Sequence, residues 1–112
     1  MPENNIKFLN FGSLNQDMVY SVDHSVRPGE TTASSKLDFF CGGKGLNQSI
    51  ALARAGATVF HAGCVGNDSD RLIAKLRDNE VDARHIKKRD MPSGHAIIQV
   101  DKNGIKLYGG VE

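Results

Sequence analysis

Three glycines within four positions, followed by polar side chains, make residues 42–47 the part of the chain best suited to hold a ligand. Glycine has no Cβ to obstruct a polar small molecule and can adopt positive φ, so Gly42 and Gly43 predict a turn at which backbone approaches a ligand. A helix that begins at such a turn presents free N–H groups, which attract oxygen-rich or anionic groups. Lys44 and Asn47 add a cation and an amide to the same mouth.

The flanking residues predict the elements that position this turn. An apolar run at 39–41 predicts the end of a strand, and the alanine-rich amphipathic segment after the turn predicts a helix that stops at Gly56. Residues 58–65 predict a buried strand, and short connections of this kind favour a parallel, right-handed crossover. The strand-helix-strand unit is typical of an α/β domain.

Two well-known phosphate-binding motifs do not match the turn. A Walker loop needs glycine where Asp38 stands and serine or threonine where Gly45 stands. A dinucleotide-binding fingerprint needs a third glycine at position 48, which is glutamine. For an isolated Gly-Gly pair, the alternative is a helix entry in which the glycines serve close packing.

A second group of polar side chains follows the first apolar run. Residues 6–11 predict a strand that ends at Gly12, and Asn15 and Asp17 come directly after it. Ligands of open α/β sheets gather beyond the carboxyl ends of the strands, so both residues are candidates for a site. The alternative is an ordinary turn whose side chains cap the backbone.

The rest of the chain predicts further strands and one more helix. Residues 18–23 and 31–40 predict extended structure outside the core, and residues 93–100 predict a strand followed by an Asn-Gly hairpin that returns antiparallel. A helix is expected to begin after Gly66 and to run to about Asn79. Asp68 and Asp70 are expected to cap its start rather than to take part in catalysis.

Composition narrows the classes of function. The 112 residues suffice for one domain at most, and a formal charge of +1 provides no field that favours nucleic acid or a membrane surface. No apolar run approaches membrane-spanning length and the start of the chain lacks a leader pattern, so the cytoplasm is the expected location. Cys41 and Cys64 are expected to be reduced and buried, and no metal-ligand spacing occurs among the cysteines and histidines.

Four blocks of the sequence, taken together, resemble the PfkB carbohydrate kinases in their ribokinase-type form. The blocks are residues 10–17, 27–31, 42–48 and 62–68. The resemblance implies an α/β fold, namely the N-terminal portion of a ribokinase-like three-layer α/β/α fold with a small β-sheet lid. It places all of residues 1–112 in one partial domain, with core elements at about 5–12 and 42–90 and lid strands at about 17–41 and 93–109.

The same resemblance implies phosphoryl transfer from ATP to a hydroxyl of ribose or a related sugar. It implies sugar contacts from Asn15, Asp17, Gly42, Gly43, Lys44 and Asn47, with Ala96 and Tyr108 where the lid approaches the sugar. ATP, magnesium and a monovalent cation are implied as cofactors, with sites outside these residues. Because the lid of the family often makes the dimer contact, the resemblance also implies a homodimer.

The catalytic base of the family lies in a late Gly-Ala-Gly-Asp segment, which nothing in this sequence matches. The nearest imitation, residues 66–68, lacks the second glycine. We therefore expect the N-terminal, sugar-binding part of a kinase, truncated or interrupted and inactive alone. The alternatives are a non-catalytic sugar-binding or dimerisation module, or the remnant of a degraded kinase.

Overall fold

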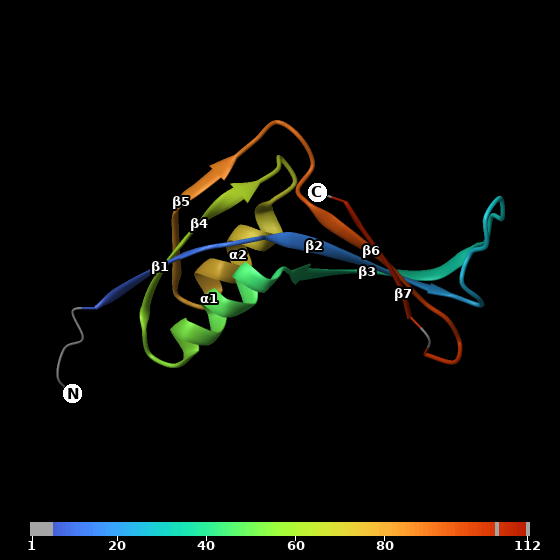
Figure 1. The fold of residues 1–112 in the computed structure, drawn as a ribbon, viewed down its shortest axis with the longest axis horizontal. Helices are drawn as coiled ribbons and strands as arrows, with labels where there is room; N and C mark the ends of the chain where they lie inside the picture. The colour runs from blue at the N-terminus through green and yellow to red at the C-terminus, as the bar shows by residue number, and fades with distance from the viewer. Residues whose placement is uncertain (1–5, 105, 112) are drawn as a thin grey trace.

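The computed structural model describes residues 6–104 and 106–111, which form two sheets and two helices (Figure 1). In chain order the elements are β1 Lys7–Phe11, β2 Asn15–Val22, β3 Ser34–Gly42, α1 Lys44–Arg54, β4 Thr58–Val65, α2 Asp70–Asp78, β5 Val81–Lys88, β6 His95–Val100 and β7 Lys106–Val111. A three-stranded sheet has the order β1-β4-β5, and a four-stranded sheet has the order β3-β2-β6-β7. We call the first the core sheet and the second the lid.

The core sheet is parallel throughout, which confirms the predicted crossover through α1. Both helices pack against the same face of this sheet, because side chains of β4 and β5 join those of α1 and α2 in one cluster. Its fully buried members include Leu46 of α1, Val59 of β4, and Leu72 and Leu76 of α2. The spacing of the apolar residues in each helix thus agrees with the face that is buried.

The opposite face of the core sheet is bare in the described part of the chain. Leu9 is 66% exposed and Phe11 is 82% exposed, and both belong to β1, one of the two edge strands of the described core sheet. The radius of gyration is 16.8 Å, whereas a compact domain of this length has about 13 Å. The described residues therefore supply one helical layer of a three-layer fold.

The lid projects away from the core sheet as a twisted, extended ribbon (Figure 1). β2 pairs antiparallel with β3 and parallel with β6, and β7 returns antiparallel to β6. This return confirms the predicted hairpin at Asn103 and Gly104, while Ile105 lies outside the described residues.

Residues 81–86 resemble the family's link from a helix to a strand, and residues 81–88 form β5 along the open side of β4. Two local predictions were wrong. The side chain of Asp68 does not cap α2, whose N-cap is Ser69, but accepts a hydrogen bond from the backbone of Ser93 at 2.8 Å. Both cysteines carry free thiols, as expected, but Cys41 is only half-buried and Cys64 is exposed.

Candidate functional site

The two polar blocks of the sequence meet where the lid leaves the core. The backbone N–H of Leu46 donates to the carbonyl oxygen of Ser13 at 3.1 Å. A Cβ placed on Gly45 would lie 2.4 Å from the carbonyl carbon of Gly12, so the two backbones approach too closely for any larger residue. The start of α1 is thereby fixed against the turn that joins β1 to β2.

Gly43 makes the reversal from β3 into α1. Its φ of 105° lies in the left-handed region, and a Cβ there would lie 2.6 Å from the carbonyl oxygen of Ser13. No side chain of the described residues caps the start of α1, and its first turn contains no acidic residue. Of the first N–H groups of the helix, that of Leu46 is bonded to Ser13, and those of Lys44 and Gly45 have no capping side chain.

Asp17 projects from β2 directly over Gly42, the last residue of β3. A Cβ placed on Gly42 would lie 2.6 Å from Oδ2 of Asp17, so the missing side chain is what leaves room for the carboxylate. Partial burial raises the pKa of Asp17 above its usual value. Within the described part of the chain this carboxylate has no hydrogen-bond or ion-pair partner, so its acceptor sites are open to a ligand.

The strand register brings two further predicted residues beside this carboxylate. Ala96 of β6 lies opposite Asp17, and Asn15 lies opposite Gly42. The register also places Tyr108 of β7 opposite Ile98, although the side chain of Tyr108 lies outside what the structure describes.

Lys44 and Asn47 open α1 with exposed side chains. Neither side chain makes a hydrogen bond or ion pair with the protein among the described residues, so both remain available to a ligand at the mouth of the turn. The structure thus gathers Asn15, Asp17 and Gly42 on one lid face and sets Lys44 and Asn47 on the adjoining helix.

A buried hydrogen-bond chain, which the sequence did not reveal, supports this junction. Nδ2 of Asn10 donates to Oγ of Ser49 at 3.0 Å and to the carbonyl of Gly45 at 3.0 Å. Oγ of Ser49 lies 2.6 Å from Nδ1 of His61, and Nε2 of His61 lies 3.0 Å from the carbonyl oxygen of Gly12. The chain connects β1, α1 and β4 to the turn that precedes β2.

The acceptors at its end fix the direction of this chain. The carbonyl of Gly12 can only accept, so Nε2 of His61 carries the proton and Nδ1 accepts from the hydroxyl of Ser49. His61 is completely buried, and burial lowers its pKa, so the neutral ring with this tautomer persists. No spacing rule signals such a chain, because its members come from three separate elements.

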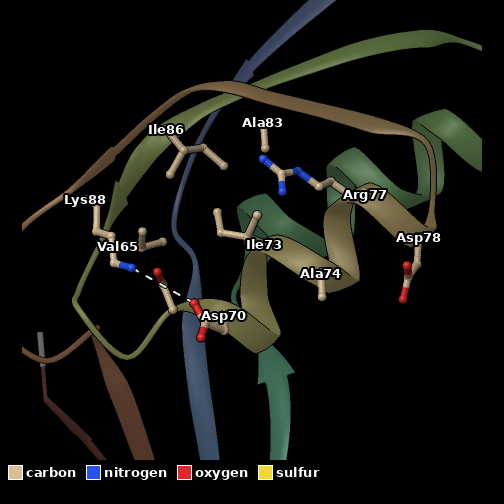
Figure 2. A pocket seen from close by; sticks show the side chains of 10 residues that line it. Val65, Asp70, Ile73, Ala74, Arg77, Asp78, Ala83, Ile86 and Lys88 are labelled. Carbon is tan, nitrogen blue, oxygen red and sulfur yellow. Dashed lines mark ion pairs between the residues drawn. The ribbon is translucent and has the colours of Figure 1, made fainter.

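A hollow with a volume of about 590 Å³ lies elsewhere, between α2 and β5 (Figure 2). Its floor is apolar, with Val65, Ile73 and Ile86, and its rim carries Asp70 and Lys88, whose charged atoms lie 4.0 Å apart. None of the predicted site residues lines it. Among the described residues no group of three or more histidine, cysteine or acidic side chains could hold a metal ion, and no helix is long and apolar enough to cross a membrane.

Known proteins resemble this chain in sequence. The sequence model described as "pfkB family carbohydrate kinase" matches residues 6–109. The chain belongs to this family. Its relatives include ribokinases. The ribokinase of Haemophilus influenzae is 40% identical over 109 residues, and the match covers 88% of this chain and 34% of the relative. That of Bacillus subtilis is 31% identical over 104 residues, covering 88% of this chain and 36% of the relative.

Solved structures agree with the fold. A ribokinase from Cryptococcus neoformans in complex with ADP has a TM-score of 0.88 and 36% identity, over 94% of this chain and 34% of that one. An Arabidopsis thaliana ribokinase complexed with ribose and ATP has a TM-score of 0.80 and 25% identity, over 92% of this chain and 35% of that one. The chain therefore has part of the ribokinase fold and spans about a third of the length of these relatives, in their N-terminal part.

Proposed function

We propose that this chain is the sugar-binding, N-terminal part of an ATP-dependent ribokinase-like kinase, with ribose or a related furanose as its ligand. The observation that carries the proposal is the carboxylate of Asp17, which is partly buried over Gly42 and has no protein partner in the described part of the chain. An ionised carboxylate offers only acceptor sites, so two neighbouring hydroxyls of a sugar can donate to it together.

The residues around Asp17 suit the rest of a polyol. Asn15 and Asn47 carry amides that both donate and accept, as a hydroxyl does. Gly42 and Gly43 let a ligand approach the backbone, and the uncapped start of α1 lies next to them. This group can grip and orient a sugar without performing chemistry on it.

Phosphoryl transfer needs groups of another kind. A sugar hydroxyl becomes a competent nucleophile through a base aligned with the γ-phosphate, and cations or N–H groups must stabilise the developing charge. Among the described residues no group of three or more acidic, histidine or cysteine side chains could hold a metal ion, and no Gly-x-Gly-Asp segment occurs in the sequence. We therefore assign no transfer step to these residues, and the 112-residue chain is expected to be inactive alone.

The lid also suits a contact between two copies of the chain. Strand alternation puts Leu37, Phe39 and Ile97 on the lid face opposite Asp17, and they are 41%, 41% and 39% exposed. Apolar side chains gathered in this way favour an interface. A homodimer through this face leaves the Asp17 face open to the sugar.

ADP formation in the presence of ribose and ATP tests the proposed kinase. We expect none from the 112-residue chain, because loss of a base alone slows such reactions by about 10² to 10⁴. We expect ADP from the same chain fused to the remaining part of the Haemophilus influenzae ribokinase, and a large loss in the Asp17→Ala fusion. Turnover by the isolated chain well above its Asp17→Ala variant would contradict the assignment, as would a folded but inactive fusion that binds ATP.

A further inference from the structure

Asp68 lies outside the sugar site, yet it contacts the starts of two lid strands that carry site residues, β2 and β6. Its Oδ1 accepts a hydrogen bond from the backbone N–H of Ser93 at 2.8 Å, just before β6 begins. Its backbone carbonyl accepts from Nε2 of Gln16 in β2 at 2.7 Å. One residue of the β4–α2 loop therefore contacts the chain immediately beside Asp17 and three positions before Ala96.

The two residues that it holds, Gln16 of β2 and Ser93 before β6, are both buried. Gln16 is 7% exposed and Ser93 is 3% exposed. Side chains alternate along a strand, so Gln16 points away from the face of Asp17 and toward the core. The backbone of Gln16 also donates to the carbonyl of Gly94 at 2.9 Å, which joins the starts of β2 and β6 to each other.

The loop that carries Asp68 is itself fixed to the segment that enters β6. The N–H of Gly66 donates to Oγ of Ser93 at 2.8 Å, in a buried position. The N–H of Asn67 donates to the carbonyl of Met91 at 2.8 Å. A Cβ on Gly66 would lie 2.1 Å from that carbonyl oxygen, so the close approach requires glycine.

We infer that Asp68 is a positioning residue for the sugar site: with Gln16 and Ser93 it clamps the starts of β2 and β6 to the core, and so sets where Asp17 and Ala96 stand relative to the glycine turn. The ladder between β2 and β6 keeps Asp17 and Ala96 together. The clamp acts on the pair as a unit, by fixing its orientation over α1. The inference rests on the proposed function for its consequence in sugar binding, but the clamp itself is testable without any sugar.

Hydrogen exchange of the 112-residue chain is the direct test of the clamp. Asp68→Ala removes the acceptor for Ser93, so the amide of Ser93 and those of β2 and β6 should exchange about tenfold faster or more. Asp68→Asn keeps an acceptor oxygen at the same place and should restore most of the protection. Asp70→Ala is the control, because it removes a carboxylate of the same charge two residues further along the chain, where the side chain is fully exposed. It should leave the exchange rates of these amides unchanged.

Equal exchange in Asp68→Ala and Asp70→Ala would overturn the inference. Should Asp68→Ala fail to fold, Gln16→Met decides the question, because it keeps the length and apolar stem of Gln16 but loses the donor to Asp68. Faster exchange confined to β2 and β6 supports the clamp, and unchanged exchange contradicts it.

Ribose binding by the same variants separates the clamp from the proposed function. If the wild type binds ribose, Asp68→Ala should weaken binding about tenfold and Asp68→Asn should retain most of it, whereas a purely structural role would leave the affinity of the folded fraction unchanged. If the wild type binds no ribose but Asp68→Ala still loosens β2 and β6, the proposed function fails and the clamp stands.

Discussion

Replacing Ser49 by alanine should destabilise the junction between core and lid by breaking the buried hydrogen-bond chain at its middle. The variant leaves Nδ1 of His61 as a buried acceptor without a donor, at a cost of about 1 to 3 kcal/mol. Asn10 keeps its bond to Gly45 but loses the one to Ser49, which adds about 1 kcal/mol. Alanine is the better helix former by about 0.5 kcal/mol, so the net loss is about 1.5 to 3.5 kcal/mol.

Urea unfolding followed by circular dichroism measures this loss, and Gln48→Ala, at the exposed neighbouring position in α1, controls for helix propensity. The two variants share the same helix and the same new residue. If Ser49→Ala lowers the free energy of unfolding no more than Gln48→Ala does, the proposed hydrogen-bond chain is refuted, because His61 would then not need the hydroxyl of Ser49.

The buried hydrogen-bond chain around His61 also predicts that the stability of the fold depends on pH. Burial lowers the pKa of His61 in the folded state, so as the pH falls the imidazole is protonated in the unfolded chain before it is protonated in the folded chain. Stability is complete above about pH 6.5 and falls by up to about 1.4 kcal/mol per pH unit as the pH drops toward the folded pKa. The contribution of His24 to the pH dependence of stability has the opposite sign, because its hydrogen bond with Glu30 raises its pKa in the folded state.

The informative quantity is therefore the difference in pH dependence between the wild type and His61→Gln. Between pH 7.5 and 5 the wild type should lose more stability than the variant, whose buried side chain does not titrate. Equal slopes would show that His61 is already charged, or that it is not buried as described.

Two further predictions follow from packing. Gly42→Ala should leave the fold intact but displace the carboxylate of Asp17, because the new Cβ meets only the end of that flexible side chain. Ribose affinity, measured by calorimetry, should therefore fall about tenfold. Gly109→Ala is the control, because a Cβ at that position meets nothing closer than 3.9 Å. The exposed face of the core sheet with Leu9 and Phe11 should make the 112-residue chain self-associate, which analytical ultracentrifugation measures. Phe11→Ser should reduce this association. A monomer whose melting temperature does not depend on concentration would contradict the prediction.

The order of strands and helices was largely predictable, because local signals agreed with the final fold. The glycine turn did end β3 and begin α1, and Gly56 did terminate that helix with φ at 95°. The Asn-Gly signal did give a hairpin between β6 and β7. Each of these signals depends on backbone conformations that the sequence encodes within a few residues.

Contacts between distant segments were not predictable in the same way. Asp68 had the local signature of a helix cap, but the segment 91–93 returns from the end of β5 and its backbone competes successfully for the carboxylate. His61 appeared as an isolated histidine, since its partners Ser49 and Gly12 are 12 and 49 positions away. The roles of the predicted sugar contacts rest on placement alone and remain predictions.

Calorimetric titration of ribose into the chain fused to the remaining part of the Haemophilus influenzae ribokinase tests the central role of Asp17. Asp17→Asn keeps the size of the side chain but loses its charge and half of its acceptor capacity, so binding should weaken by about 1.5 to 3 kcal/mol, or roughly ten- to a hundredfold. Lys44→Ala should matter less, because a flexible ammonium beside a neutral sugar has no fixed partner. Unchanged affinity in Asp17→Asn together with a collapse in Lys44→Ala would contradict the account.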